Sequence, residues 1–166
     1  MNILVTLNSN YVRPLKVMLK SLFLNNPNES FHIYILHSSL RAEELADVQK
    51  AIEAEGHVLT VIAIQDHYFA DAPIIKHYTK EMYYRLLAFK YLPAEMDKIL
   101  YLDPDILVIN EIRSLYDQDI SRYLYAAAEH ERVSVKEVNK LRLKPYEIDG
   151  YYNSGVMLLN LQLQRL

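Results

Sequence analysis

Short apolar runs alternate with helical patterns along most of this chain, and this alternation limits the possible folds more than any other feature of the sequence. Four runs have the length and aliphatic content of buried strands: residues 2–7, 31–36, 57–64 and 99–102. Three helical patterns stand between them: residues 13–24, 41–55 and 80–91. We therefore predict an α/β domain with a mainly parallel, mixed sheet flanked by helices. Ligands bind such sheets at the carboxyl ends of the strands.

The helical patterns have recognisable ends. Pro14 stands at a first-turn position, and Gly56 and Pro93 close the second and third helices. Ser38 or Ser39 can supply the N-cap of the second helix. The first helix carries an apolar stripe made of Leu15, Met18, Leu19, Leu22 and Phe23.

The rest of the chain is less regular, and residues 65–78 and 129–150 show no clear pattern. Three further elements are expected: a short turn or helix at 113–123, a strand at 124–128 and an apolar strand at 155–161. Residues 162–166 stand where another helix is expected to begin. We therefore expect residues 1–166 to be a single domain that is truncated at its C-terminus.

The composition is that of an ordinary globular protein, with 51% hydrophobic and 23% charged residues among 166. A net charge of −3 and the lack of a basic tract argue against nucleic acid as a partner. The sequence has no cysteine, which excludes disulfides and thiolate metal sites. No apolar stretch approaches the roughly 18 residues of a membrane span, and no secretory signal precedes the first strand. We expect a cytoplasmic protein.

Two carboxylates, Asp103 and Asp105, end the fourth predicted strand, and a second apolar run follows at residues 106–109. A buried strand does not normally end in two acids unless they meet a cation or a phosphate-linked ligand. In an extended backbone the two side chains point to the same side and can share one Mg²⁺ or Mn²⁺, and Pro104 disfavours a helical conformation at Asp103. The alternative is an Asp-Pro-Asp turn that is capped by its own side chains.

A polar segment, residues 8–11, follows the first strand. Asn8 and Asn10 offer donors and acceptors to a pyrimidine edge, and Tyr11 offers a stacking face. This favours a site for a base and a ribose. The alternative is that the amides only cap the following helix.

Two more segments carry candidate ligand contacts. Arg85 lies in an apolar, aromatic stretch, where a guanidinium needs a partner such as a carboxylate or a diphosphate. Residues 151–155 precede the last strand, and there Asn153 can bond sugar hydroxyls while Gly155 lets the backbone approach a ligand. The three glycines of the chain exclude a GxGxxG loop and a P-loop, and the six histidines show no metal-ligand spacing. A phosphate group must therefore be held by metal and side chains.

These segments together resemble glycosyltransferase family 8, which includes bacterial lipopolysaccharide galactosyl- and glucosyltransferases and glycogenin. The resemblance runs over essentially the whole chain, and the matching stretches are residues 3–22, 83–93, 98–108 and 151–161. It implies a GT-A fold, a nucleotide-sugar donor that is usually a UDP-hexose, a Mn²⁺ (or Mg²⁺) cofactor and transfer with retention of anomeric configuration.

The resemblance also implies roles for residues, without identifying a catalytic one. Asp103 and Asp105 match the ligands of the metal and the diphosphate, and many relatives carry an acid where Asn8 stands. The implied donor site comprises Thr6, Asn8, Asn10, Tyr11, Arg85, Asp103, Asp105, Asn153 and Ser154. A further metal-binding histidine, other donor-sugar acids and the acceptor site are expected beyond residue 166.

The resulting hypothesis is a retaining, metal-dependent transferase that moves glucose or galactose from a UDP-sugar to a saccharide or glycolipid acceptor. Two alternatives remain. Asn8 and the incomplete site favour a non-catalytic nucleotide-sugar-binding module, and the acid pair also occurs in haloacid-dehalogenase-like phosphatases, although there it follows the first strand. Contact with a membrane surface through a C-terminal part and self-association are further expectations.

Overall fold

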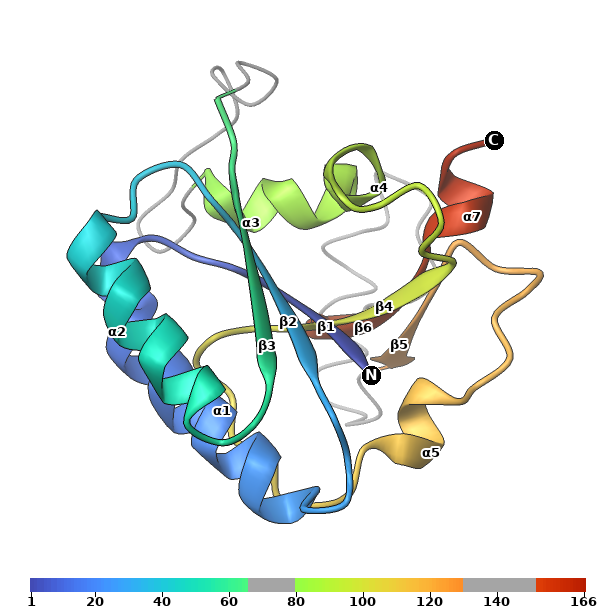
Figure 1. Cartoon of the computed structure of the whole chain (residues 1–166). Helices are drawn as coiled ribbons and strands as arrows, with labels where there is room; N and C mark the ends of the chain where they lie inside the picture. Colours follow the sequence, from blue (N-terminus) through green and yellow to red (C-terminus); the bar gives the residue numbers. More distant parts are fainter. Residues whose placement is uncertain (66–79, 130–151) are drawn as a thin grey trace, which may run out of the picture.

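The computed structural model describes residues 1–65, 80–129 and 152–166 (Figure 1). Tyr151 and nearly all of the two segments without a clear pattern, 65–78 and 129–150, therefore lie outside the described residues.

A six-stranded sheet, in the order β3-β2-β1-β4-β6-β5, forms the middle layer of the described structure (Figure 1). Its strands are β1 (Asn2–Thr6), β2 (His32–His37), β3 (Val58–Ala63), β4 (Lys98–Leu102), β5 (Tyr125–Glu129) and β6 (Tyr152–Asn160). Strands β1 to β4 are parallel, whereas β6 runs antiparallel to both β4 and β5. The mainly parallel, mixed sheet expected from the sequence is confirmed.

Helices cover both faces of this sheet (Figure 1). On one face α1 (Val12–Asn25) and α2 (Ala42–Glu53) pack against Ile3 and Val5 of β1. On the other face α3 (Glu81–Tyr84) and α4 (Ala88–Tyr91) pack against Leu4. Successive side chains of a strand point to opposite faces, so β1 contributes to both cores.

The predicted helix at 80–91 is divided in the structure into α3, the 3-10 turn η2 (Arg85–Leu87) and α4. The division lies at Leu87, whose backbone (φ −111°, ψ 14°) departs from helical geometry. Apolar spacing cannot reveal such a break, because three and 3.6 residues per turn differ little over four residues.

The predicted N-cap of the second helix is wrong. α2 is capped at Arg41, whose backbone N–H donates to the Glu44 carboxylate at 2.9 Å. Ser38 instead donates to Glu81 Oε1 at 2.7 Å and so joins the end of β2 to α3. Ser38 therefore joins two elements by a hydrogen bond and does not cap the helix that follows it.

The chain after the acid pair is not a strand but is fastened to α1. The Val108 N–H donates to Ser21 Oγ at 3.0 Å, and Asn25 Nδ2 donates to the Val108 carbonyl at 2.9 Å. The Ile112 N–H donates to Asn26 Oδ1 at 2.8 Å. Side chains of α1 thus replace a neighbouring strand as hydrogen-bond partners for residues 108–112.

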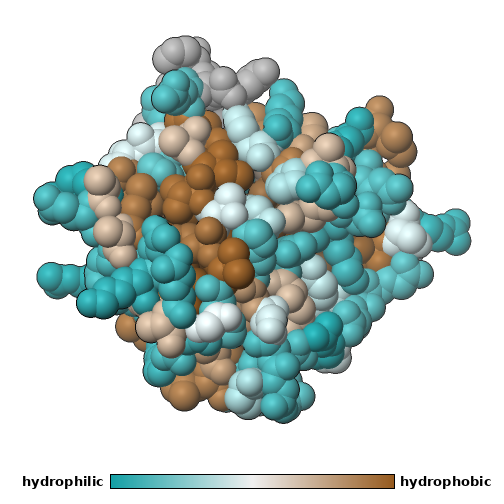
Figure 2. Space-filling view, in the orientation of Figure 1, coloured by the Kyte–Doolittle hydropathy of each residue, from teal (hydrophilic) through white to brown (hydrophobic). Residues whose placement is uncertain are grey.

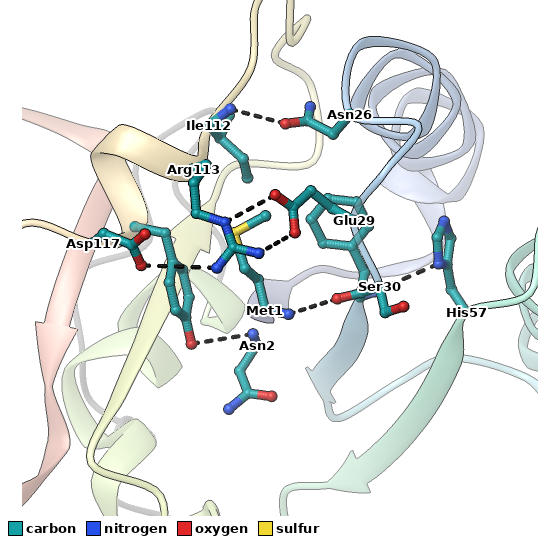
Figure 3. A network of polar contacts seen from close by, with 11 residues as sticks. Met1, Asn2, Asn26, Glu29, Ser30, His57, Ile112, Arg113 and Asp117 are labelled. Atoms are coloured by element: carbon teal, nitrogen blue, oxygen red, sulfur yellow. Dashed lines mark hydrogen bonds and ion pairs between the residues drawn. The ribbon is translucent and has the colours of Figure 1, made fainter.

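The sheet edge where β1 and β2 begin is closed by a polar network around the short helix α5 (Arg113–Tyr116) (Figure 3). Arg113 Nε donates to Glu29 Oε1 at 2.8 Å, and Figure 3 shows the guanidinium between Glu29 and Asp117. The Met1 ammonium donates to the Ser30 carbonyl at 2.5 Å. This network ties the start of the chain to the connection between α1 and β2.

Strand β3 forms one edge of the described sheet and is poorly covered. Figure 2 shows apolar side chains gathered on the face of the molecule that carries β3. Val58 and Val61 of this strand are 53% and 36% exposed.

None of the helices within residues 1–65, 80–129 and 152–166 is long and apolar enough to cross a membrane.

Candidate functional site

The acid pair and the polar segment after β1 lie at the same edge of the sheet. β1 and β4 are parallel neighbours, with Leu4 opposite Tyr101, so their carboxyl ends coincide. Thr6 ends β1 and is 4% exposed, and Asp103 follows directly after β4. The site thus forms where ligands of a parallel sheet are expected.

Asp103 is the centre of a polar network drawn from β4, β6 and η2. Its Oδ1 accepts a hydrogen bond from the Tyr101 hydroxyl at 2.5 Å and one from Arg85 Nη1 at 3.2 Å. Its backbone N–H donates to the Gly155 carbonyl at 2.7 Å. Both the main chain and the carboxylate of Asp103 are therefore held in place.

Arg85 obtains the carboxylate partner that its apolar setting requires. It is 7% exposed, and its Nη1 donates to the Ser154 carbonyl at 2.8 Å as well as to Asp103. Its guanidinium also lies 4.9 Å from the centre of the Tyr101 ring, a cation–π contact. This nitrogen of Arg85 is thus occupied by the protein itself, and Arg85 links β4 to β6.

Gly155 leaves the space that the Asp103 carboxylate occupies. A Cβ atom on Gly155 would lie 3.1 Å from Asn153 Oδ1 and 2.6 Å from Asp103 Oδ2, and the second distance is shorter than real Cβ atoms show. Asn153 is exposed, and its Oδ1 accepts from the Gly155 N–H at 2.8 Å. Glycine is needed here for this close approach.

The extended backbone expected at the acid pair is not observed. Strand β4 ends at Leu102, and Pro104 and Asp105 form a turn in which Asp105 is exposed. The two carboxylates are nevertheless close enough to interact. Burial raises the pKa of Asp103, Tyr101 and Arg85 lower it by hydrogen bonding and charge, and the charge of Asp105 raises it further.

These two carboxylates fit part of the shell of a hard divalent cation. A half-buried carboxylate next to a second one favours either protonation or a cation, and carboxylate oxygens are what Mg²⁺ and Mn²⁺ prefer. Within the described residues, no group of three or more His, Asp or Glu side chains gathers at one point. The described part of the chain therefore supplies a partial ligand set.

The polar segment after β1 forms the 3-10 turn η1 (Ser9–Tyr11), and Asn8 caps this turn, as one of the two interpretations of the sequence had it. Asn8 Oδ1 accepts from the Asn10 N–H at 3.0 Å. Ser9 donates to Glu44 Oε2 at 2.9 Å. The hydrogen bonds from Arg41, and to a smaller extent the one from Ser9, lower the pKa of the Glu44 carboxyl to about 2. Asn10 is exposed and Tyr11 half-buried. The segment stands beside the site with its Asn8 oxygen already bonded.

Sequence reasoning missed Tyr101 as a member of this network. Its hydroxyl lies 3.4 Å from Thr6 Oγ1 and donates to Asp103. A signal was present, because residues two apart in a strand point to the same side and Tyr101 stands two positions before Asp103.

A largely apolar cavity of about 660 Å³ adjoins the network. Arg85, Asn153, Ser154 and Gln164 are among the polar residues of its wall. The apolar part is made of residues from α3, η2, α4, β5, β6 and the last helix, α7 (Leu161–Gln164), among them Met82, Leu86, Phe89, Met157 and Leu163.

The model of the family described as Glycosyl transferase family 8 matches residues 2–166. General stress protein A of Bacillus subtilis is 28% identical over 171 residues, which cover 99% of this chain and 57% of that protein. Lipopolysaccharide 1,2-glucosyltransferase of Escherichia coli K12 is 26% identical over 163 residues, 98% of this chain and 48% of that protein. The chain thus spans about half the length of these curated relatives.

A solved structure confirms the fold. The galactosyltransferase LgtC in complex with donor and acceptor sugar analogs superposes with a TM-score of 0.88 at 28% identity. The match covers all of this chain and 60% of that one. The architecture is that of a GT-A glycosyltransferase, as the sequence predicted.

Proposed function

Because the chain belongs to glycosyltransferase family 8, we propose that the whole protein transfers glucose or galactose from a UDP-sugar to a saccharide or glycolipid acceptor, with retention of anomeric configuration. The observation that carries the proposal is Asp103, which Tyr101, Arg85 and the Gly155 backbone hold at the carboxyl end of β4. Several relatives are named as lipopolysaccharide transferases, so we propose an acceptor of that class.

We propose that Asp103 and Asp105 hold Mn²⁺ or Mg²⁺. When bound, the cation would neutralise charge on the diphosphate leaving group. Arg85 and Tyr101 keep the Asp103 carboxylate in one orientation, so no reorganisation is needed when the donor enters.

The proposed donor site extends over both sides of the acid pair. Thr6, Asn10 and Tyr11 are the proposed contacts of the uridine, with Tyr11 as the stacking face. Asn8 contributes there by capping η1. Asn153 and Ser154 border the cavity beside Arg85 and are the proposed contacts of the donor sugar.

Substitution of the acid pair tests this proposal. In the whole protein, Asp103→Asn and Asp105→Asn together should lower Mn²⁺-dependent turnover of UDP-hexose by at least about 100-fold, because electrostatic stabilisation of the leaving group is lost. Asp47→Asn, which removes an exposed carboxylate that pairs with Lys16 on α1, is the matched control and should keep its turnover. Full activity of the double variant, or of the wild type in excess chelator, would overturn the metal assignment.

A non-catalytic nucleotide-sugar-binding module is the second candidate. Two observations favour it: Asn8 uses its side-chain oxygen to cap η1, and the described residues supply only two acidic ligands. Calorimetry of the 166-residue chain with UDP and Mn²⁺ tests binding, and turnover of a longer chain separates enzyme from binder. The phosphatase alternative loses its basis, since the chain belongs to a transferase family.

Other expectations stay predictions. These are a single domain, a cytoplasmic location, contact with a membrane surface and self-association. The exposed edge strand β3, with Val58 and Val61, is the surface where we expect self-association. Light scattering of the wild type and of Val61→Lys over a range of concentrations would test this.

A further inference from the structure

Tyr101 is a fully buried tyrosine whose hydroxyl lies at the proposed donor site. Its side chain is 1% exposed within β4. The hydroxyl donates to Asp103 Oδ1 at 2.5 Å and lies 3.4 Å from Thr6 Oγ1. A buried phenol needs a hydrogen-bond partner, but this one uses a carboxylate that the proposed function needs for a cation.

The two carboxylate oxygens of Asp103 have different surroundings. Oδ1 accepts from both Tyr101 and Arg85. Oδ2 faces Gly155 and occupies the space that a Cβ atom there would need. The Asp103 main chain is fixed at the same time by the Gly155 carbonyl. The carboxylate therefore cannot turn without breaking hydrogen bonds to Oδ1.

We propose that Tyr101 is a positioning residue. Its hydroxyl keeps Asp103 Oδ1 in a hydrogen bond within the protein, so that Oδ2 is the oxygen that binds the cation. Groups that hydrogen-bond a metal ligand fix its orientation and contribute strongly to metal affinity. The Tyr101 ring has a separate task, because the Arg85 guanidinium lies over it at 4.9 Å. This inference rests on the proposed cation site at Asp103 and Asp105.

The chain offers a close control for the hydroxyl. Tyr34 and Tyr101 both flank Leu4, one on β2 and one on β4, and they belong to the same apolar core. Tyr34 is 5% exposed, and its hydroxyl is 3.1 Å from His32 Nδ1. Tyr34→Phe thus removes a buried phenolic hydroxyl from the same sheet face without touching Asp103.

The test is Mn²⁺ binding to the whole protein without nucleotide, measured by the electron paramagnetic resonance signal of free Mn²⁺. Tyr101→Phe keeps the ring under Arg85 and should weaken binding by about tenfold or more. Tyr34→Phe should stay within about twofold of the wild type, although both variants lower the melting temperature through a lost hydrogen bond. Equal affinities of the wild type and Tyr101→Phe would overturn the positioning role.

One further variant separates this inference from the proposed function. Asp103→Asn should abolish binding, and a wild type that binds no better than Asp103→Asn would overturn the cation site and the inference together. A loss in Tyr34→Phe as large as in Tyr101→Phe would show a general structural effect and overturn the specific role.

Discussion

At the scale of single residues, Asp103 is held by three parts of the chain that lie far apart in sequence. Tyr101 is its neighbour on β4, Arg85 comes from η2, and Gly155 comes from β6. The carboxylate is half-buried, and its burial raises its pKa. Such a group is stable as an anion only because these donors, and in our proposal a cation, compensate for lost hydration.

Gly155→Ala is predicted to damage the site through contact alone. The new Cβ would lie 2.6 Å from Asp103 Oδ2, so the carboxylate has to move away from Tyr101 and Arg85. We expect overpacking to lower the free energy of unfolding by about 1–3 kcal/mol. We also expect Mn²⁺ affinity to fall by about tenfold.

The matched control for this change is Gly56→Ala. Gly56 has φ +80° but nothing within 4 Å of its added Cβ. Backbone strain of about 1–2 kcal/mol should destabilise that variant, while Mn²⁺ affinity should stay at the wild-type value. Thermal melts and Mn²⁺ titrations of both variants check the pair, and an unchanged affinity in Gly155→Ala would contradict the close contact.

At the scale of elements, several connections are made by side chains that bond backbone groups of another element. Asn25 and Asn26 at the end of α1 bond the backbone of residues 108–112. Arg165 after α7 donates to the carbonyls of residues 89–96, at and beyond the end of α4. These contacts set where the site elements lie, because they satisfy backbone groups that no neighbouring strand reaches.

Arg165→Ala is predicted to be clearly destabilising. Its guanidinium donates to the carbonyls of Pro93, Ala94 and Met96 at 2.8–2.9 Å and to that of Phe89 at 3.2 Å. Hydrogen bonds from a charged group support an expected loss of about 1–3 kcal/mol in the free energy of unfolding.

Urea denaturation measures this loss. Arg165→Lys should fall between alanine and wild type, because a lysine keeps the charge but cannot reach all four carbonyls. Arg122→Ala, at an exposed position, should change stability by no more than about 0.5 kcal/mol. A wild-type denaturation midpoint for Arg165→Ala would show that the hydrogen bonds of Arg165 do not stabilise the fold.

At the scale of the whole molecule, stability is predicted to fall in mildly acidic solution. Burial lowers the pKa of His32, His37 and His57, three histidines associated with β2 and β3. His37 is buried, and its Nδ1 accepts the Leu40 N–H at 3.1 Å, which requires the neutral ring. Unfolded histidine titrates near pH 6.5, so below that pH the unfolded chain binds more protons than the folded one. Stability is therefore complete above about pH 6.5 and decreases as the pH falls toward the lowered folded values.

Urea denaturation at pH 7.5, 6.5 and 5.5 checks this expectation. His37→Asn keeps an acceptor for the Leu40 N–H but cannot titrate, so its stability should depend less on pH over this interval. The carboxylates with lowered pKa, such as Glu29 and Glu44, affect stability only below about pH 4.5 and do not contribute between pH 7.5 and 5.5. A stability that is flat from pH 7.5 to 5.5 would contradict the burial of the histidines.

The sequence by itself determined the fold class, the parallel strands β1 to β4 and the acid pair at a strand end. Each of these features can be predicted from local periodicity or residue type, because both depend on how one short segment is buried. The two alternatives at Asn8 and at Asp103–Asp105 were also visible, and capping by Asn8 and a turn at the acid pair are what the structure shows.

Only the tertiary structure decided that β6 runs antiparallel between β4 and β5 and so brings Ser154 and Gly155 to Asp103. The break at Leu87 and the hydroxyl of Tyr101 on Asp103 were decided in the same way. The place and direction of β6 depend on its pairing with β4, which joins residues more than fifty positions apart, such as Leu102 and Val156. Such pairing leaves no period in either segment, because a strand has the same side-chain alternation whichever way its neighbour runs.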